Sequence, residues 1–124
     1  MKRQESAEDY LETILMVSNR LGMVRSIDVV NDMGFSKPSV SIGMKNLREK
    51  GLITMNADGY ITLTNAGAVI ARRVYERHTV LTKALVSIGV SEETAMQDAC
   101  RVEHDISVET FDRIKAFLEK NSEF

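Results

Sequence analysis

Hydrophobic residues recur every three or four positions along most of the chain, and this spacing predicts amphipathic helices. The first predicted helix covers residues 6–21, where Ser6 can serve as the N-cap and Gly22 ends the pattern. A second, shorter helix is predicted to have Ser26 as its N-cap and to close at Gly34. Each helix has its apolar residues on one face, so the two helices are expected to share a core.

A third helix is predicted directly after this pair. Ser36 is its N-cap, Pro38 lies in the first turn, where a missing N–H costs nothing, and Gly51 ends it. Two short helices joined by a tight turn with glycine are typical of a helix-turn-helix, whose second helix enters the major groove of DNA. We therefore expect the polar and basic outer face of the third helix to contact phosphates and base edges. The predicted DNA-binding residues are Ser36, Lys37, Pro38, Ser39, Ser41, Ile42, Lys45 and Arg48.

The pattern then changes from helical to alternating. Residues 52–55 and 60–63 are β-prone, and the turn-forming tetrapeptide Asn56-Ala57-Asp58-Gly59 separates them, which predicts a β-hairpin. A helix-turn-helix followed by a hairpin is a winged helix. A winged helix used only for protein contacts is the alternative, but the serine-rich, basic outer face of the third helix favours DNA.

The rest of the chain is again helical. A long helix is predicted to begin after Thr64 and to end at Gly89, and two further helices are predicted to begin after Ser91 and Ser107. The apolar residues of the last helix are expected to face inward: Phe111, Ile114, Phe117 and Leu118. The predicted fold is therefore mainly α with a small β-hairpin wing: a winged helix-turn-helix followed by an α-helical metal-binding and dimerisation region. We predict the boundary between residues 1–70 and residues 71–124.

Composition and charge narrow the class of protein. The 124 residues are 44% hydrophobic and 27% charged, which is typical of a globular chain with a real core. No apolar run approaches the roughly 18 residues that a membrane span needs, and the first residues do not form a signal peptide, so we expect a cytoplasmic protein without a membrane partner. The net charge is −2, but residues 1–78 hold 11 basic and 9 acidic residues, whereas residues 79–124 hold 5 and 9. The predicted DNA-binding half is thus the more basic one.

One short segment concentrates potential metal ligands. Cys100 is the only cysteine, and Glu103 and His104 follow it at helical spacings i+3 and i+4, so we expect a thiol, a carboxylate and an imidazole on one helix face. A lone cysteine cannot form an internal disulfide and is available to a metal. A small buried cysteine beside an exposed, capping histidine explains this spacing equally well. The spacing by itself leaves both interpretations open.

Three residues elsewhere in the chain help to decide whether this segment binds a metal. Asp9 and Glu12 lie three apart on the first helix, where acids also occur simply to stabilise the helix dipole. His78 is near the middle of the long helix, where a single histidine is more often a surface residue than a ligand. Because the architecture is expected to pack these three helices together, the combination favours a metal site.

In these segments the chain resembles the diphtheria toxin repressor and manganese transport regulator family, the metal-activated winged-helix repressors of bacteria. The resemblance covers roughly residues 6–118. The segments that carry it are Glu8-Asp9-Tyr10-Leu11-Glu12, Lys37-Pro38-Ser39-Val40-Ser41, Leu63-Thr64-Asn65-Ala66-Gly67, Arg77-His78 and Cys100-Arg101-Val102-Glu103-His104-Asp105-Ile106-Ser107. It implies that Asp9, Glu12, His78, Glu103 and His104 are at metal-ligand positions of manganese-sensing members.

Cys100 departs from that pattern. The manganese-type members have a glutamate at this position, whereas the iron-type members have a cysteine there but a methionine where this chain has Asp9. The chain therefore combines features of both branches, and its short length is expected to fit the manganese-type layout better. We expect Mn²⁺ or Fe²⁺, with Co²⁺, Zn²⁺ or Cd²⁺ as possible surrogates, and we include Cys100 among the predicted ligands.

These observations predict a metal-dependent transcriptional regulator, most simply a repressor, that binds a pseudo-palindromic operator in double-stranded DNA as a homodimer. The metal is expected to join Asp9 and Glu12 to the later ligands and so to set the orientation of the recognition helices. Apolar surface of the C-terminal helices, including Leu85, Ile88 and Phe111, is expected to form the dimer. A metal-independent winged-helix regulator is the alternative. No His-Glu-x-x-His motif and no nucleophile-base pair supports an enzyme, and we expect no small-molecule substrate.

Overall fold

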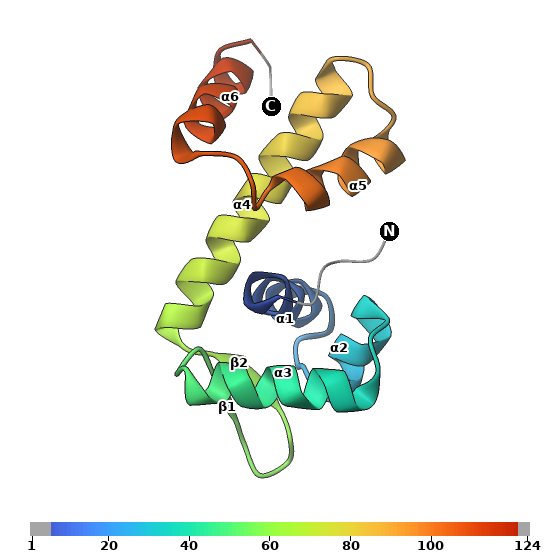
Figure 1. The fold of residues 1–124 in the computed structure, drawn as a ribbon, viewed down its shortest axis with the longest axis vertical. Coiled ribbons are helices and arrows are strands. Elements are labelled where there is room, and N and C mark those ends of the chain that lie inside the picture. The colour runs from blue at the N-terminus through green and yellow to red at the C-terminus, as the bar shows by residue number, and fades with distance from the viewer. Residues whose placement is uncertain (1–5, 122–124) are drawn as a thin grey trace. The chain divides into compact units, whose positions relative to one another are not determined.

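The computed structural model describes residues 6–121 and contains six helices and one two-stranded sheet within that range (Figure 1). Residues 1–5 and 122–124 are outside the described part. The structure divides into two compact units, one of residues 1–73 and one of residues 74–124. Within the described residues, no helix is both long and apolar enough to cross a membrane.

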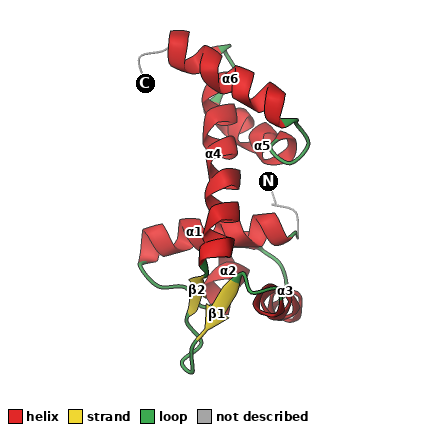
Figure 2. Cartoon of the chain, turned by 90° about the vertical axis from the view of Figure 1, so that its left-hand side faces the viewer, coloured by secondary structure: helices red, strands yellow, loops and turns green. Residues whose placement is uncertain are grey.

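The first unit is a winged helix, as the sequence predicts. The elements in order are α1 (Ala7–Leu21), α2 (Ser26–Met33), α3 (Lys37–Glu49), β1 (Ile53–Met55), β2 (Ile61–Leu63) and the first part of α4 (Asn65–Ser87). Figure 2 shows the hairpin of β1 and β2 beside α3. The side chains that meet in its core come from every one of these elements: Tyr10, Leu11, Ile14, Val17, Val24, Val29, Met33, Val40, Met44, Leu47, Ile53, Ile61 and Ala71.

Local capping sets where the helices of this unit begin and end. The hydroxyl of Ser6 accepts a hydrogen bond from the backbone N–H of Asp9, and Gly22 ends α1 in the left-handed conformation, as predicted. The prediction that Ser26 caps α2 is wrong, because Arg25 holds that position. Its backbone N–H donates to the carboxylate of Asp28 at 2.9 Å, which satisfies one N–H group at the helix start.

The hairpin pairs β1 with β2 antiparallel, with Ile53 opposite Leu63. The side-chain oxygen of Asn56 accepts from the backbone N–H groups of Asp58 and Tyr60, at 3.0 Å and 2.9 Å, and so closes the predicted turn. Only one face of so short a hairpin is buried, against α1 and α3. The core of the unit therefore holds the wing in place.

The second unit consists of the later part of α4, α5 (Glu92–Val102) and α6 (Val108–Asn121). Ser91 and Ser107 cap α5 and α6 through their hydroxyls, as predicted. Two expectations need correction. First, α5 ends at Val102, so Cys100, Glu103 and His104 do not share one helix: the last two lie in the turn that follows.

The second correction concerns α6. Phe117, which the apolar pattern places in the core, is 64% exposed, whereas Leu118 is only 4% exposed. The two positions are adjacent in sequence and about 100° apart around a helix, so only one of them can face the core.

Candidate metal centre and nucleic-acid interface

The outer face of α3 carries the residues that the sequence predicts for DNA. Val40, Met44 and Leu47 anchor the helix in the core, and the polar and basic side chains between them therefore point away from it. The predicted contact residues are all exposed or half-exposed: Ser36, Lys37, Pro38, Ser39, Ser41, Ile42, Lys45 and Arg48. This is the exposure that a recognition helix needs. Ile42 is 62% exposed, and an apolar side chain on such a face can contact the methyl group of thymine.

Close packing behind α3 fixes its distance from α1. A Cβ placed on Gly43 would lie 2.7 Å from Cε2 of Tyr10, whose ring is only 4% exposed. Glycine at this position therefore allows α3 to approach α1 more closely than any other residue would. The same ring meets Phe35 edge-on, with 6.4 Å between the ring centroids.

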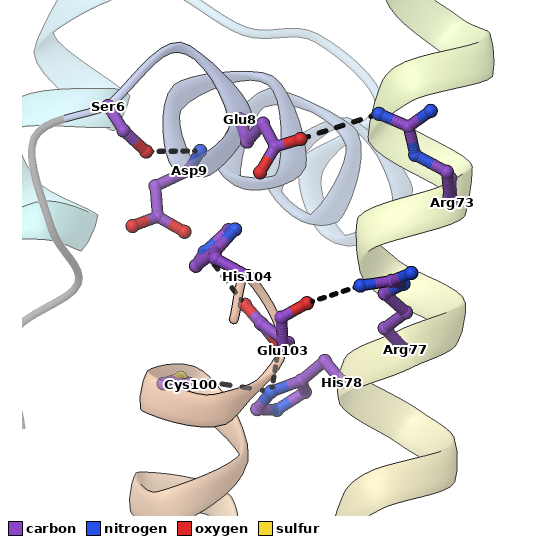
Figure 3. Close-up of polar contacts among 9 residues, drawn as sticks. All are labelled: Ser6, Glu8, Asp9, Arg73, Arg77, His78, Cys100, Glu103 and His104. Atoms are coloured by element: carbon purple, nitrogen blue, oxygen red, sulfur yellow. Dashed lines mark hydrogen bonds and ion pairs between the residues drawn. The ribbon is translucent and has the colours of Figure 1, made fainter. Parts of the chain in front are cut away.

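Three potential metal ligands meet in the second unit, at the end of α5 (Figure 3). Nδ1 of His78, on α4, lies 3.1 Å from Oε2 of Glu103 and 3.7 Å from Sγ of Cys100. One donor atom from each of these residues lies within 4.8 Å of the other two, close enough for a single ion. His78 and Glu103 are 8% and 1% exposed. The structure thus brings together three of the six predicted ligands although α5 ends before Glu103.

The electrostatics of the cluster formed by His78, Cys100 and Glu103 suit a cation. Hydrogen bonds to Cys100 and Glu103 raise the pKa of His78 from its ordinary 6.5 to about 10, against the opposing effect of burial. At neutral pH the imidazole of the metal-free protein therefore carries a proton, and a positive charge already lies between the thiol and the carboxylate. A metal ion has to replace that proton in order to bind the imidazole nitrogen.

The second carboxylate oxygen of Glu103 points to the same conclusion. Oε1 is buried and accepts no hydrogen bond from the described residues. Nε2 of His104, in the turn after α5, lies 3.5 Å from it. A buried carboxylate oxygen is costly to leave without a hydrogen-bond donor or a cation. The donor set of imidazole nitrogen, thiol and carboxylate therefore fits a divalent transition metal.

Asp9 and Glu12 belong to the first unit, on α1, and are 2% and 0% exposed. Acids that merely stabilise the helix dipole remain in water, whereas burying two carboxylates one turn apart is costly unless positive charge or donors compensate them. Their participation in the same ion as His78 stays a prediction.

A residue that the sequence singled out only through the family resemblance also contacts this group. Nη1 of Arg77 donates to the backbone carbonyl oxygens of Glu103 and Ile106, at 2.9 Å and 3.1 Å. Spacing along the sequence gives no sign of these contacts, because the partners are more than twenty residues away.

Apolar surface remains open on the second unit. Two hollows of about 290 Å³ and 380 Å³ lie along α4, α5 and α6, and Leu85 lines both of them. Ile88 and Phe117, at the second hollow, are 75% and 64% exposed. Phe111 differs from the expectation for a dimer contact: it is 5% exposed and packs within the unit against the guanidinium of Arg77, so it is not available to a partner.

Comparison with known proteins agrees with both halves of this description. The model of the iron-dependent repressor N-terminal DNA-binding domain matches residues 3–61. The model of the iron-dependent repressor metal-binding and dimerisation domain matches residues 64–123.

Individual relatives point the same way. The transcriptional regulator MntR of Escherichia coli O6:H1 is 35% identical over 119 residues, which are 96% of this chain and 77% of that protein. The HTH-type transcriptional regulator MntR of Bacillus subtilis is 31% identical over 109 residues, 88% of this chain and 77% of that protein. The structure of a manganese-dependent transcriptional repressor in complex with manganese is 28% identical, with a TM-score of 0.84 over 92% of this chain and 53% of that one. The chain thus spans about half the length of the solved structure.

Proposed function

Because the chain belongs to the iron-dependent repressor family, whose members are metal-dependent, DNA-binding transcriptional regulators and not enzymes, we propose that its own metal switch is centred on His78, Cys100 and Glu103. The observation that supports this centre is the convergence of an imidazole, a thiol and a buried carboxylate within 4.8 Å of one another. Asp9, Glu12 and His104 complete the proposed ligand set. A bound divalent cation supplies the positive charge that these donors need once the imidazole has lost its proton.

Replacing the proton of His78 by a metal ion changes the contacts between α4 and the end of α5. In the metal-free protein the protonated imidazole of His78 pairs with Glu103, which links α4 to the end of α5. A divalent ion at this place would be held by the neutral imidazole of His78, the carboxylate of Glu103 and Cys100 as a thiolate, and it would take over the link that the protonated imidazole makes. The ion can shift the protein toward its DNA-binding state only if it binds that state more tightly than the other.

For the metal itself we propose Mn²⁺ or Fe²⁺. The names of the MntR relatives and the manganese-bound structure favour manganese. The thiolate of Cys100 favours softer ions such as Fe²⁺, Co²⁺ and Zn²⁺, while carboxylates suit harder ions. Co²⁺, Zn²⁺ and Cd²⁺ are useful surrogates for experiments.

For DNA we propose that α3 enters the major groove through its outer face, from Ser36 to Arg48. The DNA-binding and dimerisation domains of the family imply two copies of α3 in a homodimer, and a dimer with two-fold symmetry reads a pseudo-palindromic operator. We keep residues 1–70 and 71–124 as the proposed functional domains, and the cytoplasm, where bacterial DNA lies, as the proposed location.

For the dimer we propose the apolar surface along α4 and α6 that contains Leu85 and Ile88, extended by Phe117. Ile88 is the most exposed of these residues, so Ile88→Glu adds a charge with little effect on the core. Sedimentation of the variant is expected to show dissociation into monomers. A variant that remains as fully dimeric as the wild type would place the interface elsewhere.

One titration tests the central proposal. An operator is first selected from random duplexes with the metal-loaded protein, and its affinity is then measured against Mn²⁺, Fe²⁺, Co²⁺ and Zn²⁺ for the wild type and for Glu103→Gln. We expect at least one ion to tighten DNA binding by tenfold or more in the wild type and to have much less effect in the variant. Unchanged affinity with every ion would favour the metal-independent regulator.

A further inference from the structure

Arg77 directly precedes His78 on α4, and its guanidinium is held from two sides. Nη1 donates to the carbonyl oxygens of Glu103 and Ile106, as Figure 3 shows for Glu103. The guanidinium carbon lies 5.3 Å from the ring centroid of Phe111, a residue of the α6 core. A side chain fixed by two hydrogen bonds and a stacking contact has little freedom to leave this position.

The two carbonyl groups that Arg77 contacts belong to the segment after α5, where the regular helical hydrogen bonding has ended. At the end of α5 the N–H of Glu103 donates to the carbonyl oxygen of Ala99, and in the turn that follows the N–H groups of Asp105 and Ile106 both donate to Val102. The carbonyl groups at a helix end have no partner within the helix, so a cation donor from elsewhere stabilises them. Arg77 supplies that donor to the turn that carries Glu103.

As a result, two consecutive residues of α4 contact Glu103 at two different places. Arg77 binds its backbone oxygen at 2.9 Å, and His78 contacts its side-chain Oε2 at 3.1 Å. Fixing the backbone of Glu103 relative to His78 limits where the carboxylate can lie. The same contact determines the separation between two of the proposed metal ligands.

We propose that Arg77 is a positioning residue of the metal site, one that holds the Glu103 turn against α4 so that the carboxylate faces His78 and Cys100. This inference rests on the proposed function, since it assigns Arg77 to the same three-donor site. A positive charge near a cation site by itself opposes metal binding. The sign of the effect of removing Arg77 therefore separates positioning, which predicts weaker binding, from electrostatics, which predicts tighter binding.

The experiment uses the full chain with Co²⁺, whose visible and near-ultraviolet absorption reports coordination geometry and thiolate ligation. Co²⁺ affinity and the absorption spectrum are measured for the wild type, Arg77→Met and Arg77→Lys. Loss of a residue that orients a metal ligand typically weakens affinity by about 10- to 100-fold. We expect that loss, with an altered spectrum, for Arg77→Met, and a smaller loss for Arg77→Lys, which keeps the charge but not the planar group.

Arg101→Met is the matched control. It removes the same charge from the end of α5, but Arg101 pairs with Asp98 at 3.8 Å and its side chain is 66% exposed. We expect this variant to bind Co²⁺ as the wild type does or slightly more tightly. Circular dichroism of the metal-free proteins checks folding, and if Arg77→Met is unfolded, Arg77→Lys decides.

The outcomes separate this inference from the function on which it rests. Tighter Co²⁺ binding by Arg77→Met, or wild-type affinity and spectrum in the folded Arg77 variants, overturns the positioning role while Glu103→Gln still weakens binding. If Glu103→Gln itself binds Co²⁺ like the wild type, the proposed metal centre fails and the role of Arg77 fails with it. Weaker Co²⁺ binding and an altered spectrum in both Arg77 variants support the inference, provided that Arg101→Met binds Co²⁺ at least as tightly as the wild type.

Discussion

The proton on His78 leads to a quantitative prediction for metal affinity. Its pKa of about 10 means that the imidazole of the metal-free protein must lose a proton before it can bind an ion at any pH below that value. Each pH unit below the pKa costs a factor of ten in apparent affinity, about 1.4 kcal/mol. At pH 7 the affinity is thus about a thousandfold below its value at high pH, which corresponds to about 4 kcal/mol. Between pH 6 and pH 8 we expect it to rise at least a hundredfold.

The assay is a competition titration of Zn²⁺ or Co²⁺ against a chromophoric chelator at pH 6, 7 and 8, corrected for the chelator's own protonation. Proton nuclear magnetic resonance of the metal-free protein identifies the group, because the chain has only two histidines and His104→Gln leaves only His78. We expect the His78 ring to remain protonated beyond pH 8. An imidazole that titrates near pH 6.5, or the same metal affinity at pH 6 and pH 8, would refute the reasoning.

The same pKa predicts how the stability of the metal-free protein depends on pH. The folded protein binds the His78 proton more tightly than the unfolded chain does, so the stabilisation is complete below about pH 6.5 and is lost as the pH rises through about 10. Because the hydrogen bond to Cys100 is the largest cause of the shift, Cys100→Ser is expected to lower the pKa of His78 toward its ordinary value. Thermal unfolding between pH 6 and pH 9 should then depend less steeply on pH in Cys100→Ser than in the wild type.

Three further variants test other parts of the structure. Cys100→Glu is expected to shift metal preference toward Mn²⁺, since a carboxylate suits a harder ion, and competition between Mn²⁺ and Co²⁺ that remains as in the wild type would contradict this role for the thiol. Gly43→Ala is expected to lower the free energy of unfolding by about 1–2 kcal/mol, because the new Cβ meets the buried ring of Tyr10. This clash outweighs the better helix propensity of alanine. Denaturant unfolding that shows equal or higher stability would disprove it. Lys45→Ala with Arg48→Ala is expected to weaken operator binding and to reduce its dependence on salt while Co²⁺ affinity stays constant, and an unchanged salt slope would remove these residues from the DNA contact.

Much of the winged helix could be predicted from local chemistry. Ser6, Ser36 and Ser91 cap helices because their hydroxyls accept hydrogen bonds from the first turn, and Gly22 and Gly34 end helices because they adopt a positive φ. These interactions act over four residues or fewer. For the same reason the exposed face of α3 could be predicted, since Val40, Met44 and Leu47 fix which side of that helix is buried.

The metal centre was only partly predictable. The sequence indicates His78, Cys100 and Glu103 as candidate ligands, but the spacing of Cys100 and Glu103 predicts a shared helix face, whereas α5 ends at Val102 in the structure. Their approach depends on the pairing of α4 with the end of α5, through contacts between residues that are more than twenty positions apart. No local pattern contains that information.

The sequence by itself thus determined the helices, the wing, the recognition face and the identity of the potential ligands, because capping, turn formation and hydrophobic periodicity act between near neighbours in the chain. Only the tertiary structure decided which ligands meet, that Phe111 is a core residue while Phe117 is exposed, and that Arg77 binds the turn that carries Glu103. These features depend on how whole helices pack together. Packing buries Glu103 beside an imidazole and a thiol, and that burial makes an ordinary carboxylate a candidate metal ligand.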